Sequence, residues 1–294
     1  MRLRLPRWPW LITSAVVLVL LGLAVQVWMT IERPKGAIRA IRRQGGRVVV
    51  ETGGPIWLRQ KIGDERMAVF DEVVEVNLDG ADFADDAVRY LQVLPKLRSL
   101  NLSGTQITDA GLRALRPSDD LQVLRLSGTK LTDASLDQLR KFPSLKRLDV
   151  GDTGITDAGM PMIAGLRSLE HLDLRATPVT DGGLVHLRGL KHLKFIDLDG
   201  TEVTDRGLDC LDGKPSLERV SLNTTQISDM GLAHIEPLGG LLKLGLTGTQ
   251  VTDAGVLRLK KLAKLRELNL TGTRVTEEAV DELQQAIPLC RIFW

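Results

Sequence analysis

The chain has 294 residues and a net charge of +2, with 43% hydrophobic and 26% charged residues, as is usual for a folded protein. The charge is uneven. Residues 1–47 carry nine Lys or Arg and one Glu, which leaves 30 basic and 36 acidic residues, a net charge of −6, for the rest. This balance excludes a general nucleic-acid surface on the larger part of the chain, and we predict no nucleic-acid partner.

The chain begins with a basic flank, residues 1–9, and continues with an apolar segment, residues 10–31. These 22 residues contain no charge and would span about 33 Å as a helix, which is enough to cross a bilayer. Tryptophans at positions 8, 10 and 28 stand where interfacial aromatic residues are expected. The segment therefore predicts a single-pass transmembrane helix that serves as a signal anchor.

Two questions about this segment stay open. A cleaved signal peptide is the alternative, with Gly22-Leu-Ala24 as the cleavage site, although the apolar run continues to Ile31. Basic residues stand on both sides of the segment, so their count does not fix its orientation. We expect the N-terminus in the cytoplasm and the remainder of the chain outside it.

Residues 32–71 lack the pattern of the rest of the chain and predict an N-terminal cap. The expected elements are a helix at 36–43 that ends at Gly45-Gly46, a strand at 47–51 and a helix at 55–62 that begins with proline. A stacked-repeat domain needs a cover for its first open core. Ile56 and Trp57 are the residues that we expect to fill that role.

From residue 72 to residue 294 the chain repeats itself every 24 residues. The unit reads Leu-x-x-Leu-x-Leu-x-x-Thr-x-Ile/Val-Thr-Asp-x-Gly-Leu-x-x-Leu. Its first half alternates like a short strand, and its second half has the spacing of a helix face. A unit of this kind cannot bury its apolar side alone, so the period predicts a solenoid of stacked coils. The period is marked by Asp109, Asp133, Asp157, Asp181, Asp205, Asp229 and Asp253.

Three further positions of the unit have physical explanations. A column of threonines, such as Thr105 and Thr129, is expected to link buried backbone groups from coil to coil through the hydroxyls. The pair Thr108-Asp109 predicts a helix cap and a negative charge at the helix N-terminus. Gly111 and its counterparts indicate that neighbouring helices approach closely.

The unit resembles the leucine-rich repeat, with Thr where many members carry Asn or Cys, and the repeats resemble those of bacterial membrane-anchored proteins. The resemblance covers residues 72–294. It implies an α/β fold, a right-handed solenoid with a parallel sheet on the concave face and short helices on the convex face. It also implies a protein-binding scaffold and supplies no catalytic residue.

On the strands, alternation places one set of side chains on the face that points away from the core. In the central coils this set is rich in charge, and it is our candidate protein-binding surface. Its members are Arg147, Asp149, His171, Asp173, Arg175, Phe195, Asp197, Asp199 and Arg219. Three interpretations stay open: a solvated lattice in which Arg and Asp neutralise one another, a partner-binding site, and a metal or catalytic carboxylate cluster.

The sequence contains no motif that predicts catalysis, a cofactor or a metal. His186, His192 and His234 have no obvious partners, and the two cysteines, Cys210 and Cys290, lie too many coils apart to form a disulfide. We therefore predict a membrane-anchored protein-binding scaffold that is not an enzyme. The alternative is a structural envelope or surface protein that self-associates through the ends of its repeats. Ser118 and Lys214 stand where other coils have apolar residues. We therefore predict that the packing between neighbouring coils is weakest at these two positions, which we call the weak joints.

Overall fold

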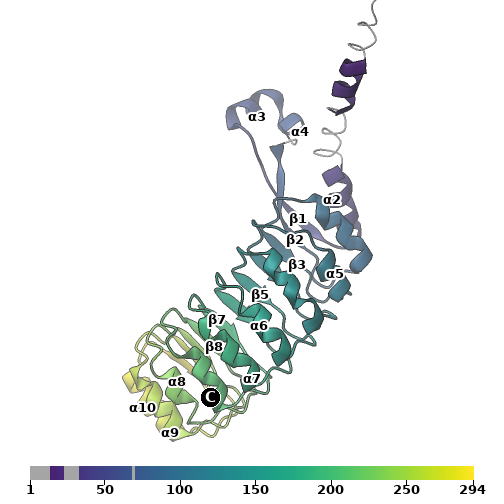
Figure 1. The fold of residues 1–294 in the computed structure, drawn as a ribbon. Helices are drawn as coiled ribbons and strands as arrows, with labels where there is room; N and C mark the ends of the chain where they lie inside the picture. Colours follow the sequence, from purple (N-terminus) through teal and green to yellow (C-terminus); the bar gives the residue numbers. More distant parts are fainter. Residues whose placement is uncertain (1–13, 23–32, 68–69) are drawn as a thin grey trace, which may run out of the picture.

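The computed structural model describes residues 14–22, 33–67 and 70–294. Its main body is a curved solenoid in which eleven strands form one sheet and short helices cover the other side (Figure 1). The strand order in the sheet follows the order along the chain. The strands are β1 (Arg47–Glu51), β2 (Glu72–Asn77), β3 (Ser99–Asn101), β4 (Val123–Arg125), β5 (Arg147–Asp149), β6 (His171–Asp173), β7 (Phe195–Asp197), β8 (Arg219–Ser221), β9 (Lys243–Gly245), β10 (Glu267–Asn269) and β11 (Arg291–Phe293).

The helices are short, and many of them are 3-10 helices, labelled η. The α-helices are α2 (Arg33–Arg43), α3 (Ile56–Ile62), α4 (Asp64–Met67), α5 (Asp109–Ala114), α6 (Met160–Ile163), α7 (Asp181–Leu184), α8 (Leu232–Ile235), α9 (Asp253–Val256) and α10 (Glu277–Ala286). The 3-10 helices are η3 (Asp85–Val93), η4 (Asp133–Lys141), η5 (Asp157–Gly159), η6 (Val185–Gly189), η7 (Asp205–Leu211) and η8 (Leu257–Lys261).

Residues 14–22 are helical, and the remainder of the predicted transmembrane segment lies outside the described residues. Among the helices that the structure describes, none combines the length and the apolar character that a bilayer crossing needs. The transmembrane helix at 10–31 therefore stays a prediction.

The repeat predicts its coil correctly. From β3 onward each coil contributes a strand of three residues, and parallel neighbours pair with a shift of one period, as in the pairing of Leu148 with Leu172. The leucines of the strand and the apolar residues of the helix point into one continuous core, where Leu172 and Leu184 are fully buried. Because burying a leucine side chain contributes about 1.5 to 3 kcal/mol, the stacked leucines are the main source of stability.

The threonine column acts within each coil, and our expectation that it links neighbouring coils is wrong. In the buried side chain of Thr177, Oγ1 donates to the carbonyl oxygen of Leu174, three residues earlier, at 2.5 Å. Thr105, Thr153 and Thr249 repeat this bond with the same spacing at 2.6 to 2.7 Å. The hydroxyl thus closes the bend after the strand, where that carbonyl points inward.

Neighbouring coils are joined instead by the aspartates at the helix starts. Asp181 accepts from the backbone N–H of Thr204 at 2.8 Å and from its hydroxyl at 2.6 Å. The same two bonds join each such aspartate to the Thr or Ser 23 residues later, from Asp85 to Asp253. We call this column the aspartate ladder. The aspartates do begin helices as predicted, but their carboxylates belong to the next coil.

The predicted cap is confirmed at Thr108 and at most other helix starts, although Thr204 and Thr252 accept no capping bond, and the small helix residues follow from the ladder. Thr108 Oγ1 accepts from Ala110 N at 3.2 Å while it donates to Asp85. A Cβ atom on Gly207 would stand 2.4 Å from Asp181 Oδ1, so the close approach involves a carboxylate of the preceding coil. The glycines therefore leave room for the ladder.

The N-terminal region contains the three expected elements. Helix α2 begins three residues earlier than predicted, strand β1 pairs antiparallel with β2, and α3 follows Pro55. The predicted core cover is wrong, however: Ile56 and Trp57 are 75% and 61% exposed. Ile41 of α2 is fully buried and packs in the first core instead. The 55–62 helix lacked any pattern that would show which face is covered.

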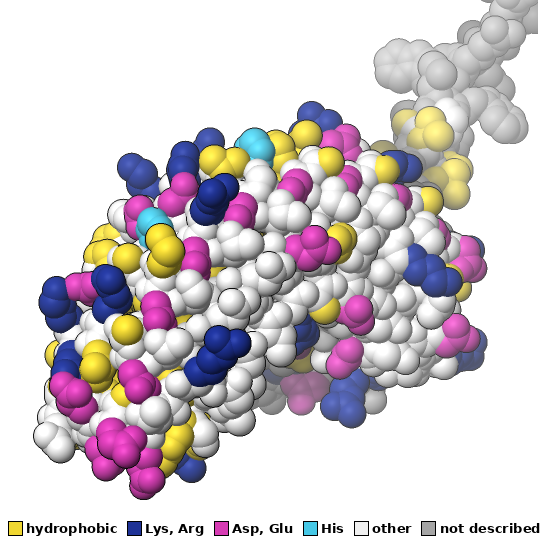
Figure 2. Space-filling model, turned by 90° about the horizontal axis from the view of Figure 1, so that it is seen from below, with side chains coloured by type: hydrophobic (Ala, Val, Ile, Leu, Met, Phe, Trp, Pro, Cys, Tyr) yellow, Lys and Arg dark blue, Asp and Glu magenta, His cyan; other side chains and the backbone are white. Residues whose placement is uncertain are grey.

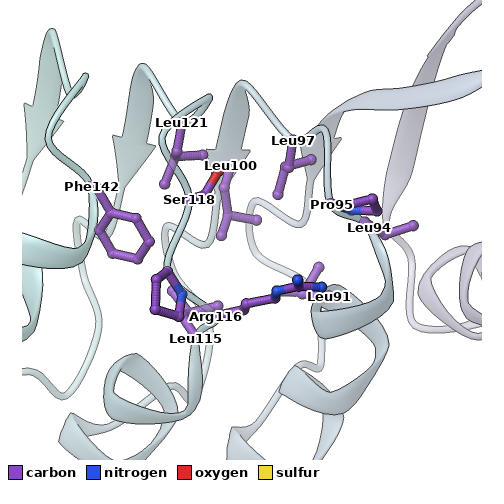
Figure 3. Close-up of a pocket in the computed structure, with 11 residues that line it drawn as sticks. Leu91, Leu94, Pro95, Leu97, Leu100, Leu115, Arg116, Ser118, Leu121 and Phe142 are labelled. Carbon is purple, nitrogen blue, oxygen red and sulfur yellow. The ribbon is translucent and has the colours of Figure 1, made fainter.

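The two predicted weak joints differ. Beside Ser118 the core contains a cavity of about 40 Å³, lined by Leu94, Leu115 and Phe142 among others (Figure 3). Lys214 is buried, but its Nζ donates to the carbonyl oxygens of Leu187, Arg188 and Leu190 at 2.9 to 3.2 Å. The expectation of a weak joint at Lys214 overlooked these three acceptors.

At the C-terminal end, α10 buries Val280 and Leu283 over the last coil. Strand β11 is the outer edge of the sheet, and the side chain of Trp294 just after it is 58% exposed. Cys210 and Cys290 are both free and buried, which agrees with the prediction that they do not pair.

Candidate functional site

The parallel register brings the predicted surface residues into rows. One row runs across the sheet from Arg147 through His171 and Phe195 to Arg219, and a second contains Asp149, Asp173 and Asp197. Equivalent positions on neighbouring strands lie about 4.8 Å apart. Arg175 and Asp199 follow the strands in a third row. The predicted residues therefore share one continuous surface on the central strands.

The three aspartates of the second row, which we call the carboxylate row, have the same local geometry. In each, Oδ1 accepts from the backbone N–H two residues later, at 3.0 to 3.1 Å. These bonds fix the side chains just beyond the ends of the strands. All three side chains are half-buried, and the backbone bond occupies one oxygen, Oδ1, of each carboxylate.

Burial raises the pKa of all three carboxyl groups. For Asp149 burial is the main cause, and for Asp173 the negative charge of Asp149 adds to it. For Asp197 burial raises the pKa to about 7, where the charges of Asp199 and Asp173 add to a rise that the hydrogen bond from the Asp199 backbone opposes. The ionised form of the row is therefore less stable than that of ordinary surface aspartates.

Arg175 is the cation nearest to the row. Its guanidinium nitrogens lie 3.9 Å from Asp149 Oδ2 and 3.7 Å from Asp173 Oδ2, and the side chain is 49% exposed. Among the described residues, Arg147, Arg219 and Asp197 form no ion pair within 4.0 Å. The lattice of alternating Arg and Asp is thus limited to the surroundings of Arg175, and most of the charge of Asp197 is not compensated by contact.

Asp199 has a different environment from the carboxylate row. Its two oxygens accept from the backbone N–H and from the side-chain amide of Asn223, both at 2.8 Å. Asn223 Oδ1 in turn accepts from the backbone N–H of Thr247 at 2.7 Å. Of the predicted site residues, Asp199 is therefore the one whose carboxylate is already used to join coils.

His171 and Phe195 form the aromatic part of the surface. Their ring centroids lie 5.9 Å apart with an interplanar angle of 46°, and both side chains are half-buried. Burial lowers the pKa of His171, and the neighbouring charge of Arg147 lowers it further. The imidazole is therefore neutral at pH 7, and the pair offers apolar area between the exposed Arg147 and Arg219.

One feature beside this surface was not anticipated. Asp152, Ala176 and Thr224 have φ angles of 51° to 53°, in the left-handed region where the other coils carry glycine, as at Gly128 and Gly248. A side chain in this region costs about 1 to 2 kcal/mol. The signal was available in the sequence, as three replacements in a column of glycines, and all three lie in coils next to the carboxylate row.

Histidine and acidic side chains also lie elsewhere in the described part of the chain. No group of three or more His, Cys, Asp and Glu side chains there could hold a metal ion. His234 lies 3.0 Å from Asp212, a partner that was not expected from the sequence. Across most of the face shown in Figure 2, basic and acidic side chains are interspersed. The carboxylate row differs from this mixed pattern, because it places three acidic side chains on adjacent strands.

Three segments of the chain, residues 93–115, 143–164 and 189–211, match the Leucine Rich repeat family. Each segment includes a convex helix of the solenoid described above. The fold is that of a leucine-rich repeat solenoid. A comparison with the curated proteins found no match.

Among solved structures, the leucine-rich repeat solenoid is similar to internalin C2 from Listeria monocytogenes. The two have 24% sequence identity and a TM-score of 0.47, over 76% of this chain and 79% of the other. A likeness of this degree carries no function over to this chain.

Proposed function

We propose that this leucine-rich repeat protein is a membrane-anchored scaffold that binds a protein partner on the concave face of its central coils. The carboxylate row is the observation that supports the proposal. Adjacent carboxylates about 4.8 Å apart repel one another by roughly 3 to 4 kcal/mol at an effective dielectric near 20. A surface shaped for stability alone has little reason to place three of them on neighbouring strands.

The chemistry of the surface indicates what the partner presents to it. A basic or hydrogen-bond-donating segment would relieve the repulsion that Arg175 leaves uncompensated. Phe195, beside His171, is an apolar anchor of the kind that often dominates binding energy. The partner that fits is a protein segment with Arg or Lys next to an apolar side chain.

The test uses a photoreactive amino acid at Phe195 of the full chain in native membranes. The partner should be cross-linked there, and Asp173→Asn with Asp197→Asn should abolish the product while the melting temperature rises or stays unchanged. Asp181→Asn is the matched control, because it removes a charge from the aspartate ladder and should lower the melting temperature without loss of the product. A double variant that loses stability and keeps its partner would mean that the row is structural.

Membrane anchorage through residues 10–31 is the second part of the proposal. It is supported by the length and apolar character of that segment in the sequence. We place the N-terminus in the cytoplasm and the repeats outside. Carbonate extraction should leave the protein in the membrane pellet, whereas a mature N-terminus at Val25 would show cleavage of the segment.

Self-association through the repeat ends is the alternative function, and the C-terminal edge gives it a specific observation. Leu289 and Trp294, on either side of β11, are 71% and 58% exposed. If this end joins copies of the chain, Trp294→Ala should reduce the sedimentation coefficient of the purified protein. An unchanged coefficient would leave the concave-face scaffold as the function.

A further inference from the structure

The N-terminal region contains a projection that the solenoid does not use. We call residues 53–67, which include α3 and α4, the finger. Figure 1 shows it projecting beyond β1 and β2, away from the stacked coils. Its large apolar side chains Ile56 and Trp57 are 75% and 61% exposed, and Phe70 at its base is 48% exposed. A group of exposed apolar side chains at one end of a molecule indicates an interaction surface.

The finger has a defined conformation, because hydrogen bonds and ion pairs at its base fix it while its tip is exposed. Arg59 donates to the carbonyl oxygen of Gly53 at 2.9 Å and pairs with Asp71 and with Asp64. Gly53 N donates to Asp71 at 3.2 Å. Met67 is fully buried against these turns. The clamp at the base therefore holds α3 with Ile56 and Trp57 outward.

Basic side chains lie at the same end of the solenoid as the finger, on α2 and at the start of β1 (Figure 1). Arg39, Arg42 and Arg43 of α2 and Arg47 of β1 are exposed, and none of them pairs with a carboxylate in the part of the chain that the structure describes. On the finger itself, Lys61 lies 5.8 Å from the ring of Trp57. The acidic Asp64 is paired with Arg59. An exposed tryptophan next to Lys61, with unpaired arginines at the same end of the molecule, is a combination that the interface of a bilayer with anionic lipids binds.

We infer that the finger and α2 dock on the surface of an anionic bilayer, with Ile56 and Trp57 at the depth of the headgroups and the arginines of α2 against the lipid phosphates. The inference rests on the proposed membrane anchor. That segment ends at Ile31, two residues before α2 begins at Arg33, so α2 starts at the membrane surface. Figure 1 places the start of α2 and the finger at the same end of the solenoid. The short tether keeps both surfaces close to lipid, so a weak contact suffices.

Docking at this point would also orient the solenoid. A single anchoring point does not set the angle between the repeats and the bilayer. A second contact through the finger fixes the N-terminal coil against the bilayer and directs the concave face away from it at a constant angle. The finger is thus a support that sets how the repeats are presented.

The test follows Trp57 in the full chain reconstituted into vesicles. Phenylalanine replaces Trp8, Trp10, Trp28 and Trp294, so that Trp57 is the remaining tryptophan. In vesicles that contain phosphatidylglycerol, its emission should shift to the blue, and lipids brominated near the headgroup should quench it several-fold more than in pure phosphatidylcholine. The control chain keeps Trp294 instead of Trp57, and its emission should not respond to brominated lipid.

A second variant separates charge from burial. Arg39→Glu, Arg42→Glu and Arg43→Glu together should remove most of the quenching of Trp57 without changing the thermal melting of the solenoid. The inference is overturned if Trp57 is not quenched by brominated lipid, including the case in which it is shielded from aqueous acrylamide by another protein. Carbonate extraction distinguishes failure of this inference from failure of the proposed anchor. A chain that stays in the pellet with an unquenched Trp57 refutes the docking of the finger alone. A chain that is released from the membranes refutes the anchor as well.

Discussion

Two columns of aspartates run along this solenoid with the same 24-residue spacing, and they have opposite effects on its stability. In the aspartate ladder, both oxygens of Asp181 accept hydrogen bonds from Thr204 of the next coil. In the carboxylate row, Asp197 accepts one bond from its own chain and faces two other carboxylates, and its pKa rises to about 7. The ladder holds coils together, whereas the row brings like charges together on the central coils, where we propose that a partner binds.

The difference comes from what stands opposite each carboxylate. Across the ladder is a Thr or Ser whose N–H and hydroxyl both point at the acid. For Asp109, hydrogen bonds from Thr132 and Ser135 outweigh the burial that opposes them and lower its pKa. Across the carboxylate row is another acid at the same register. The same residue type is therefore stabilising or destabilising according to the neighbour that the period supplies.

The largest effect should follow from breaking the ladder. Asp181→Ala leaves the N–H and the hydroxyl of Thr204 without their acceptor, and we expect a loss of about 2 to 4 kcal/mol in the free energy of unfolding. Urea denaturation measures it. The matched change in the row, Asp197→Ala, should cost far less or raise stability, and equal losses for the two would contradict the distinction.

Next in size is the threonine bond inside the coil. Thr177→Val keeps the shape of a side chain that is 2% exposed but leaves the Leu174 carbonyl without its donor. The expected loss is about 1 to 3 kcal/mol by the same measurement. Because the bond is internal to one coil, the amides of the neighbouring coils should keep their hydrogen-exchange protection. Loss of protection in the next coil would mean that the threonine hydroxyl does link neighbouring coils.

The carboxylate row should make the free energy of unfolding depend on pH. A carboxyl group whose pKa is raised on folding binds more protons in the folded than in the unfolded state, so stability is highest below the unfolded value and falls as pH rises from about 4 to about 7. Asp197→Asn should reduce this decline and gain about 1 kcal/mol at pH 8, since the half-buried charge is partly screened. A variant with the same pH profile as the original chain would mean that Asp197 is ionised without penalty.

The sequence predicted the fold because its signals are local. The strand alternation and the helix spacing lie within one unit of 24 residues, and repetition makes them unambiguous. The rows of surface residues were predictable for the same reason, since the parallel register is one period. The coil-to-coil bond of the ladder was missed, because the sequence does not show which side chain reaches the next coil.

The N-terminal region was harder for a physical reason. Residues 32–71 occur once, so no repetition separates the buried face of a helix from its exposed face. Both α2 and α3 carry apolar residues, and the sequence alone favoured Ile56 and Trp57 as the core cover. The structure buries Ile41 instead. Choosing between the two helices needed the antiparallel pairing of β1 with β2, which places α2 against the first coil and directs the finger outward.

The smallest effect concerns the two joints where a polar residue replaces an apolar one. Lys214 fills its place and is satisfied by three carbonyls, whereas Ser118 leaves a cavity of about 40 Å³. At about 24 cal/mol per Å³, filling that cavity is worth at most about 1 kcal/mol. Ser118→Leu restores the residue found at Leu94 and should raise the melting temperature slightly, with a gain of at most about 0.5 kcal/mol after the loss of the bond from Asp120 N to Ser118 Oγ. Ser118→Ala is the control, because it loses that bond without filling the cavity and should not stabilise. If Ser118→Leu destabilises instead, the cavity walls are too rigid to admit the side chain, and the joint at Ser118 is as well packed as its counterparts.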